Sequence, residues 1–213
     1  MNEPRQPTEN PYWHELDKPH VVDRDEIQNL CLECLHVVLA SNSMSALWVD
    51  DDEDPAWEFP NLAALHHRSA EAQLSRSLLK LAVLVRTFDD QCRETPGYLD
   101  HRRKIDGEQG PFGSFHEGDG ELGIRESCNK IIHANDFRPV YDNGSAPRDE
   151  GVWSMDGTVE LTGRDRQRGW LVGLNVLAFL EAAIDLTSFV CPQEQSAEAA
   201  GPLMPETSVR RMT

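Results

Sequence analysis

The stretch NLAALHHRSAEAQLSRSLLKLAVLVRTFDDQC, residues 61–92, carries the clearest periodicity in the chain. Apolar side chains recur in it at alternating spacings of four and three residues, which is the repeat of one face of an α-helix. These residues are Leu74, Leu78, Leu81, Val85, Phe88 and Cys92. The pattern predicts a long amphipathic helix that packs on partner helices, with Arg76, Lys80 and Arg86 on its flanks.

Three other segments have helical patterns. EIQNLCLECLHVV (26–38) places its apolar residues on one helical face, and Asp23 or Asp25 can cap the helix. A short helix is expected at about 121–134. VLAFLEAAIDLTSFV (176–190) is apolar on most faces, so we expect a central helix there, capped by Asn175. The sequence therefore predicts a mainly α fold, a helical bundle of about four helices.

A β-hairpin is expected as an addition to this bundle. TVELTG and RGWLVGL alternate apolar and polar residues, which is typical of strands with one buried face, and predict a hairpin near 158–174. The segment 97–120 is rich in glycine and charge and lacks periodicity, so we interpret it as a long loop. The segment 137–151 contains two prolines and an Asn-Gly pair, which predict turns.

Composition indicates one globular domain with irregular ends. The chain is 39% hydrophobic and 27% charged, as is typical of globular proteins. We expect an irregular N-terminal arm at 1–21, a helical domain that includes the hairpin at 22–191 and a disordered tail at 192–213. No apolar run approaches the roughly 20 residues that cross a bilayer. The N-terminal residues lack a secretory pattern, so a cytoplasmic protein without membrane contact is expected.

Neither the cysteines nor the acidic residues predict a cofactor. The five cysteines are odd in number and irregularly spaced, which is a poor disulfide framework. Cys31 and Cys34 lie within a helical pattern, and no second pair accompanies them, so buried core thiols are expected rather than a zinc site. The acidic run VDDDEDPAWE (49–58) is interpreted as a hydrated loop. No metal and no cofactor are expected.

The charge of the chain limits the nucleic-acid surfaces that it can form. Asp and Glu number 37 against 20 Lys and Arg, so the formal net charge is −17. Such a surface repels a phosphate backbone except where positive charge is gathered locally. The densest positive patch in the sequence is formed by Arg102, Arg103 and Lys104. The net charge therefore does not exclude a narrow nucleic-acid site that is lined by a few cations.

The stretch RESCNKIIHAND, residues 125–136, suggests chemistry. Arg125, Asn129 and His133 recur at every fourth position, so on a helix they share one face beside the buried stripe. Arg binds phosphate, Asn positions a group, and His transfers protons near neutral pH. Metal-independent RNA cleavage needs such groups, because the 2′-hydroxyl of RNA supplies the nucleophile. The structural alternative is a hydrogen-bonded helix flank, with His133 meeting the last carbonyls.

The segment CNKIIHA (128–134) resembles the signature of the HEPN superfamily, small helical-bundle domains of prokaryotic toxin and antiviral systems. Asn129 and His133 match the Asn and His of the common motif, and Ala134 matches the small residue that often follows. Cys128 stands where an active relative has Arg, and Arg125 lies one helical turn earlier. The resemblance covers about residues 24–135.

The resemblance implies a homodimeric, metal-independent endoribonuclease of a bacterial defence or toxin system, with RNA and a neutralising or activating protein as partners. In its catalytic set, Arg125 would contact phosphate, Asn129 would orient it, and His133 would act as general acid or base. Its RNA-binding set would be Lys130, Arg102, Arg103 and Lys104. The alternative is a non-catalytic HEPN-like module for protein–protein contacts.

Overall fold

The computed structural model of the protein describes residues 22–44, 47–49, 56–143, 153–166 and 168–190. The N-terminal arm expected at 1–21, the tail expected at 192–213 and most of the acidic run at 49–58 lie outside the described residues.

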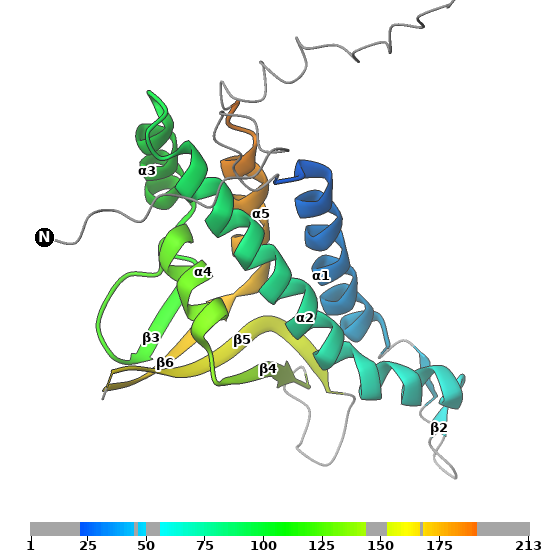
Figure 1. Ribbon diagram of the computed structural model, residues 1–213. Coiled ribbons are helices and arrows are strands. Elements are labelled where there is room, and N and C mark those ends of the chain that lie inside the picture. Colours follow the sequence, from blue (N-terminus) through cyan, green and yellow to red (C-terminus); the bar gives the residue numbers. More distant parts are fainter. Residues whose placement is uncertain (1–21, 45–46, 50–55, 144–152, 167, 191–213) are drawn as a thin grey trace, which may run out of the picture.

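The fold is α+β, so the prediction of a mainly α bundle of about four helices with an appended hairpin is wrong. The described helices are α1 (Arg24–Met44), α2 (Pro60–Cys92), α3 (Tyr98–Gln109), α4 (Ile124–His133) and α5 (Val176–Thr187). One four-stranded antiparallel sheet consists of β3 (Gly113–Glu117), β4 (Asp136–Asp142), β5 (Ser154–Asp165) and β6 (Arg168–Asn175). Two short strands, β1 (Trp48–Val49) and β2 (Ala56–Trp57), pair separately. Figure 1 shows the helices gathered on one side of the larger sheet.

The long helix predicted from the apolar repeat is confirmed as α2, which has 33 residues. The whole predicted stripe from Leu74 to Cys92 is buried. Helix α1 packs along α2 (Figure 1). The Ser77 hydroxyl donates to Glu33 at 2.8 Å, and Lys80 forms an ion pair with Glu26, so polar contacts at the rim fix the register of the two helices.

The predicted hairpin is confirmed as β5 and β6, but both strands are longer than expected and belong to a sheet with the order β3-β6-β5-β4. The edge strand β3 approaches β6 at Gly113, where φ is +154° and an added Cβ would lie 2.0 Å from the Gly173 carbonyl oxygen. Only glycine fits there. Strand β4 forms the other edge and tolerates Pro139, because it pairs with β5 alone.

The prediction of a long loop between residues 97 and 120 is wrong, because this segment contains α3 and β3. Helix α3 buries only Tyr98 and Ile105, which are seven residues apart, and it contains Gly107. A helix with two buried residues gives no recognisable apolar repeat. The turn-rich interpretation of 137–151 is corrected in the same way, because β4 occupies its beginning.

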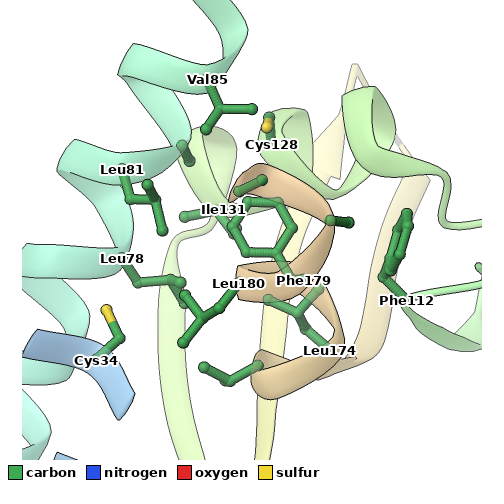
Figure 2. Packing of buried hydrophobic residues seen from close by; sticks show 14 of the residues in the cluster. Cys34, Leu78, Leu81, Val85, Phe112, Cys128, Ile131, Leu174, Phe179 and Leu180 are labelled. Carbon is green, nitrogen blue, oxygen red and sulfur yellow. The ribbon is translucent and has the colours of Figure 1, made fainter. Parts of the chain in front are cut away.

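The core lies between the sheet and the helices, with α5 at its centre. Figure 2 shows Cys128 and Ile131 of α4 packed close to Leu81 and Val85 of α2, beside Phe179 of α5. The Asn175 side chain accepts a hydrogen bond from Ala178 N at 3.0 Å, which confirms the predicted cap of α5. None of the described helices combines the length and apolar content needed to cross a bilayer.

The states of the cysteines in the structure agree only in part with the prediction from the sequence. Cys31 and Cys34 are free and buried, as expected, and burial raises the pKa of Cys31 to about 11 and that of Cys34 to about 12. Cys92 is disulfide-bonded, which the irregular cysteine spacing does not predict.

Candidate functional site

Helix α4 carries the motif residues, and its first turn is fixed by α3. The Asp106 carboxylate of α3 accepts a hydrogen bond from Ile124 N at 2.7 Å. This contact supplies the cap that Gly123 at the N-cap position lacks. The buried residues of α4, including Cys128 and Ile131, then orient the helix against α2. The motif stripe consequently runs along the edge of the core.

At the N-terminal end of the stripe, Arg125 contacts the carboxylates of α2. Its guanidinium forms an ion pair with Asp89 and donates to Asp90 at 2.9 Å. The Asp89 side chain is only 2% exposed, and it also accepts hydrogen bonds from Tyr98 and Arg102, both at 2.9 Å. A buried carboxylate is thus satisfied by two guanidinium groups and a phenol.

Arg86 of α2 extends this arrangement toward the middle of α4. It forms an ion pair with Asp90, and its Nε donates to Asn129 Oδ1 at 3.2 Å. Hydrogen bonds from Arg86 and then Arg125 lower the pKa of Asp90 against the opposing effect of burial. We call Arg86, Asp89, Asp90, Tyr98, Arg102 and Arg125 the Asp89 cluster.

Both the oxygen and the nitrogen of the Asn129 amide form hydrogen bonds. Its oxygen accepts from Arg86, while its nitrogen donates to Glu126 at 3.2 Å. Glu126 also forms an ion pair with Lys130 at 3.2 Å. A chain of polar contacts therefore runs from the Asp89 cluster along the exposed side of α4.

Cys128 occupies the position at which the resemblance would place Arg, and it belongs to the core. Its side chain is 1% exposed. Burial chiefly, with a smaller contribution from Asp89, raises the pKa of the thiol far above its usual range. The thiol stays protonated and unreactive at neutral pH. An Arg at this position would have to place its charge in the buried interior, beside an Asp89 carboxylate that is already paired.

At the C-terminal end of the stripe, α4 and the end of the β5–β6 hairpin enclose a polar cleft of about 620 Å³. We call it the α4–hairpin cleft. It is lined by Glu126, Asn129, Lys130, His133, Asn135, Arg164, Asp165 and Trp170.

Trp170 forms one wall of the cleft and holds Lys130. The Lys130 ammonium lies 4.5 Å from the centroid of the Trp170 ring and 5.3 Å from that of Phe115. Such cation–π contacts fix the position of the charge. Gly163 makes room for the indole, because an added Cβ would lie 2.2 Å from the ring and 2.9 Å from the His133 carbonyl oxygen. The hairpin is thereby held against the end of α4.

His133 is exposed at this cleft. Among the described residues its imidazole takes part in no hydrogen bond and no ion pair, whereas Arg125 and Asn129 are both engaged. The structure thus brings Asn129, Lys130 and His133 together at the cleft and places Arg125 in the Asp89 cluster.

The basic patch expected from the sequence is divided. Arg102 points into the Asp89 cluster. Arg103 and Lys104 are exposed on α3, near Asp100 at 2.8 Å and Glu108 at 4.0 Å. Neither residue lines the α4–hairpin cleft. Their charge is consequently offset within their own helix.

Several residues of these two sites are not predicted by the sequence. The strand pattern assigns Arg164, Asp165 and Trp170 only to a hairpin, and the helical pattern assigns Asp89 and Asp90 only to a helix end. One local feature of the sequence indicates the Asp89 cluster. Asp89 follows Phe88 of the apolar stripe and is buried with it, so its carboxylate needs polar partners. The described residues contain no group of three or more His, Cys, Asp and Glu side chains that could hold a metal ion.

Comparisons of the chain with models of known families, with curated proteins and with solved structures found no match.

Proposed function

We propose that this chain is an RNA-directed protein related to the HEPN superfamily, and that its α4–hairpin cleft holds the RNA. The observation that carries this proposal is the position of His133. It is exposed and without a side-chain partner among the described residues, in a cleft that also contains Lys130, Arg164 and Glu126. An imidazole beside cations and a carboxylate is a suitable set for chemistry on a phosphodiester.

The proposed reaction is metal-independent cleavage of RNA. The 2′-oxygen attacks the adjacent phosphorus and loses its proton to a base, while the bond from phosphorus to the 5′-oxygen breaks and an acid protonates that oxygen. The products are a 2′,3′-cyclic phosphate and a 5′-hydroxyl. His133 serves as the general acid or base, and Lys130 and Arg164 offset the charge of the phosphate. Asn129 orients the phosphate, while Arg125 acts indirectly by holding α4.

We further propose a cytoplasmic homodimer that belongs to a bacterial defence or toxin system and is controlled by a neutralising or activating protein. A second copy would cover exposed apolar residues on the outer face of α2. Leu79 and Val83 lie one helical turn apart there, and each is 44% exposed. Apolar side chains at this spacing suit helix–helix association.

Cleavage of a mixed RNA pool in the presence of EDTA tests this function. Wild-type protein should cleave, and His133→Ala should lose the activity while keeping its fold, because the imidazole is exposed. His36→Ala is the matched control, since His36 is an exposed imidazole on α1, away from the cleft. Equal cleavage by the His133 variant would disprove the role of this residue.

A second candidate function is a non-catalytic module for protein–protein contacts. It is favoured by the engagement of Arg125 and Asn129 inside the protein and by the burial of Cys128. Folded, dimeric wild-type protein that neither binds nor cleaves RNA would make this the better account.

A further inference from the structure

We infer that the arginine-rich end of the β5–β6 hairpin is the surface that holds the backbone of a single-stranded RNA as it leaves the cleft. This inference rests on the proposed function, and it moves the RNA-binding surface away from Arg102, Arg103 and Lys104. The surface, called here the hairpin tip, consists of Arg164, Asp165, Arg166 and Arg168.

The hairpin tip is a local excess of positive charge on an acidic protein. Three arginines and one aspartate leave a formal charge of +2, whereas the whole chain carries −17. All four side chains are exposed. In the described part of the chain, none of the three arginines forms an ion pair, although Asp165 lies opposite Arg168 in the ladder. The arginines of α3, by contrast, each have a carboxylate partner.

The backbone at Arg166 is a second, independent observation. Its φ is +55°, and among the described residues it is the only residue other than glycine with a positive φ. A turn that closes a hairpin in this conformation favours Gly or Asn, and another L-residue is strained there. Turn geometry therefore does not account for an arginine at this position. Strained residues of this kind cluster at ligand-binding sites, which fits an arginine kept for its side chain.

The hairpin tip continues directly from the α4–hairpin cleft. Arg164 and Asp165 line the cleft together with Lys130 and His133, and Arg166 follows them in the turn. A strand with its scissile phosphate at His133 would pass the hairpin end, where arginines can contact successive phosphates bidentately. Such contacts position a strand without reading its sequence.

The charge distribution of the protein favours binding of single-stranded RNA over binding of an RNA duplex. A duplex presents phosphates over a broad surface and would meet much of the acidic protein. A single strand needs only a narrow track of cations. The hairpin tip provides such a track, and the adjoining cleft also holds the exposed Asn135, whose amide can contact bases or sugars.

Binding of a labelled, single-stranded 2′-O-methyl RNA of mixed sequence tests the inference, because this probe lacks the nucleophile and stays intact. Fluorescence anisotropy at several salt concentrations would compare wild type with Arg164→Ala, Arg166→Ala, Arg168→Ala and the triple variant. Each single variant should bind about 3- to 10-fold more weakly, and the triple variant about 100-fold. The salt slope of log K should fall by about 0.7 for each phosphate that no longer has a cationic partner.

Two further variants separate binding from folding. Arg166→Gly removes the guanidinium and suits the positive φ, so it should weaken binding while its melting temperature is equal to or above that of wild type. Arg138→Ala removes an exposed arginine from the edge strand β4, which does not line the cleft, and should bind within about 2-fold of wild type.

The outcomes distinguish this inference from the proposed function. If wild type binds the probe and the triple variant binds with the same affinity and salt slope, the cleft still holds RNA and the inference is overturned. If wild type neither binds the probe nor cleaves RNA, the proposed function fails and the inference fails with it. If polyglutamate displaces the probe as well as unlabelled RNA does, the tip is a general polyanion surface, and RNA as its partner is rejected.

Discussion

The two ends of α4 place similar side chains in opposite situations. At the N-terminal end, Arg125 contacts Asp89 and Asp90 in a cluster where each charge has an opposite charge beside it. At the C-terminal end, His133 and Arg164 border an open cleft and have no ionic partner among the described residues. The two ends are two turns apart on one helix. A pocket of about 430 Å³ also borders Arg125, but Arg125 is paired with carboxylates of the protein, whereas His133 and Arg164 have no such partners in the described part of the chain.

This difference separates a structural role from a functional one. Buried charges are tolerated only when they are paired, and their removal leaves the partners uncompensated. Exposed side chains without partners contribute little to stability, so their removal affects binding or chemistry instead. Substitutions in the Asp89 cluster should therefore be measured first as changes in unfolding free energy, and those at the cleft first as changes in RNA binding or cleavage.

The largest effect is expected from Cys128→Arg, which places an arginine where the proposed HEPN relationship would have one. The position is 1% exposed, so the new charge would be buried, and the nearby Asp89 carboxylate is already paired with Arg102 and Arg125. We expect a decrease of more than about 4 kcal/mol in unfolding free energy, which is most of the stability of a marginal domain. Cys128→Ala is the control and should cost far less. Chemical denaturation followed by circular dichroism measures both, and a stable Cys128→Arg protein would show that α4 can rotate.

Removal of the central carboxylate should have the next largest effect. Asp89→Ala leaves Arg102 and Arg125 without their buried partner, and we expect it to cost about 3–5 kcal/mol. Asp90→Ala is the matched control, because the Asp90 side chain is 51% exposed and its ion pairs are screened by water. Urea denaturation should show a cost of about 1 kcal/mol or less for the control. Equal effects of the two substitutions would contradict the distinction between them.

The sequence contains enough information to place α1, α2, α4, α5 and the hairpin, but not the sheet. Apolar residues at spacings of three and four, or alternating, mark elements that bury one whole face. Helix α3 buries only Tyr98 and Ile105, β3 begins at Gly113, and β4 includes Pro139. Strands β3 and β4 lie at the edges of the sheet, and α3 buries too little of its surface to show a repeat. Tertiary contacts rather than local pattern determine these three elements.

The candidate site shows the same limit. The spacing of four residues correctly places Arg125, Asn129 and His133 on one helix. It does not indicate what each side chain meets, because Arg125 and Asp89 are 36 residues apart in the chain. The basic patch near residue 103 is also visible in the sequence, but the pattern does not show that Arg103 and Lys104 pair with Asp100 and Glu108 of the same helix. The arginines of the hairpin tip have Asp165 as a neighbour, but none of them forms an ion pair with a described residue.

A direct comparison of the two ends of α4 should give a moderate difference in stability. Arg125→Ala removes the ion pairs with Asp89 and Asp90 from a side chain that is 26% exposed, and should cost about 1–3 kcal/mol. His133→Ala should stay within about 0.5 kcal/mol of wild type. Thermal unfolding of the two variants at pH 7 measures this difference. A His133 variant as unstable as the Arg125 variant would identify the imidazole as a structural group.

The smallest effect concerns pH and the contact that begins α4. Burial raises the pKa of Asp106 above its value in the unfolded chain, although the hydrogen bond from Ile124 N and the charge of Arg102 oppose this. The folded protein thus binds this proton more tightly than the unfolded chain. Stability from this group is greatest below the unfolded pKa and disappears as the pH rises through the folded pKa.

Asp106→Asn should remove this dependence, because an amide oxygen still accepts from Ile124 N and carries no charge. Relative to wild type, the variant should become more stable as the pH rises from about 4 to 7, as measured by urea denaturation at several pH values. Asp106→Ala removes the cap as well and should cost about 0.5–2 kcal/mol near neutral pH. Parallel stability curves for wild type and the Asn variant would mean that Asp106 titrates alike in the folded and unfolded chains. The start of α4 would then depend on the hydrogen bond alone.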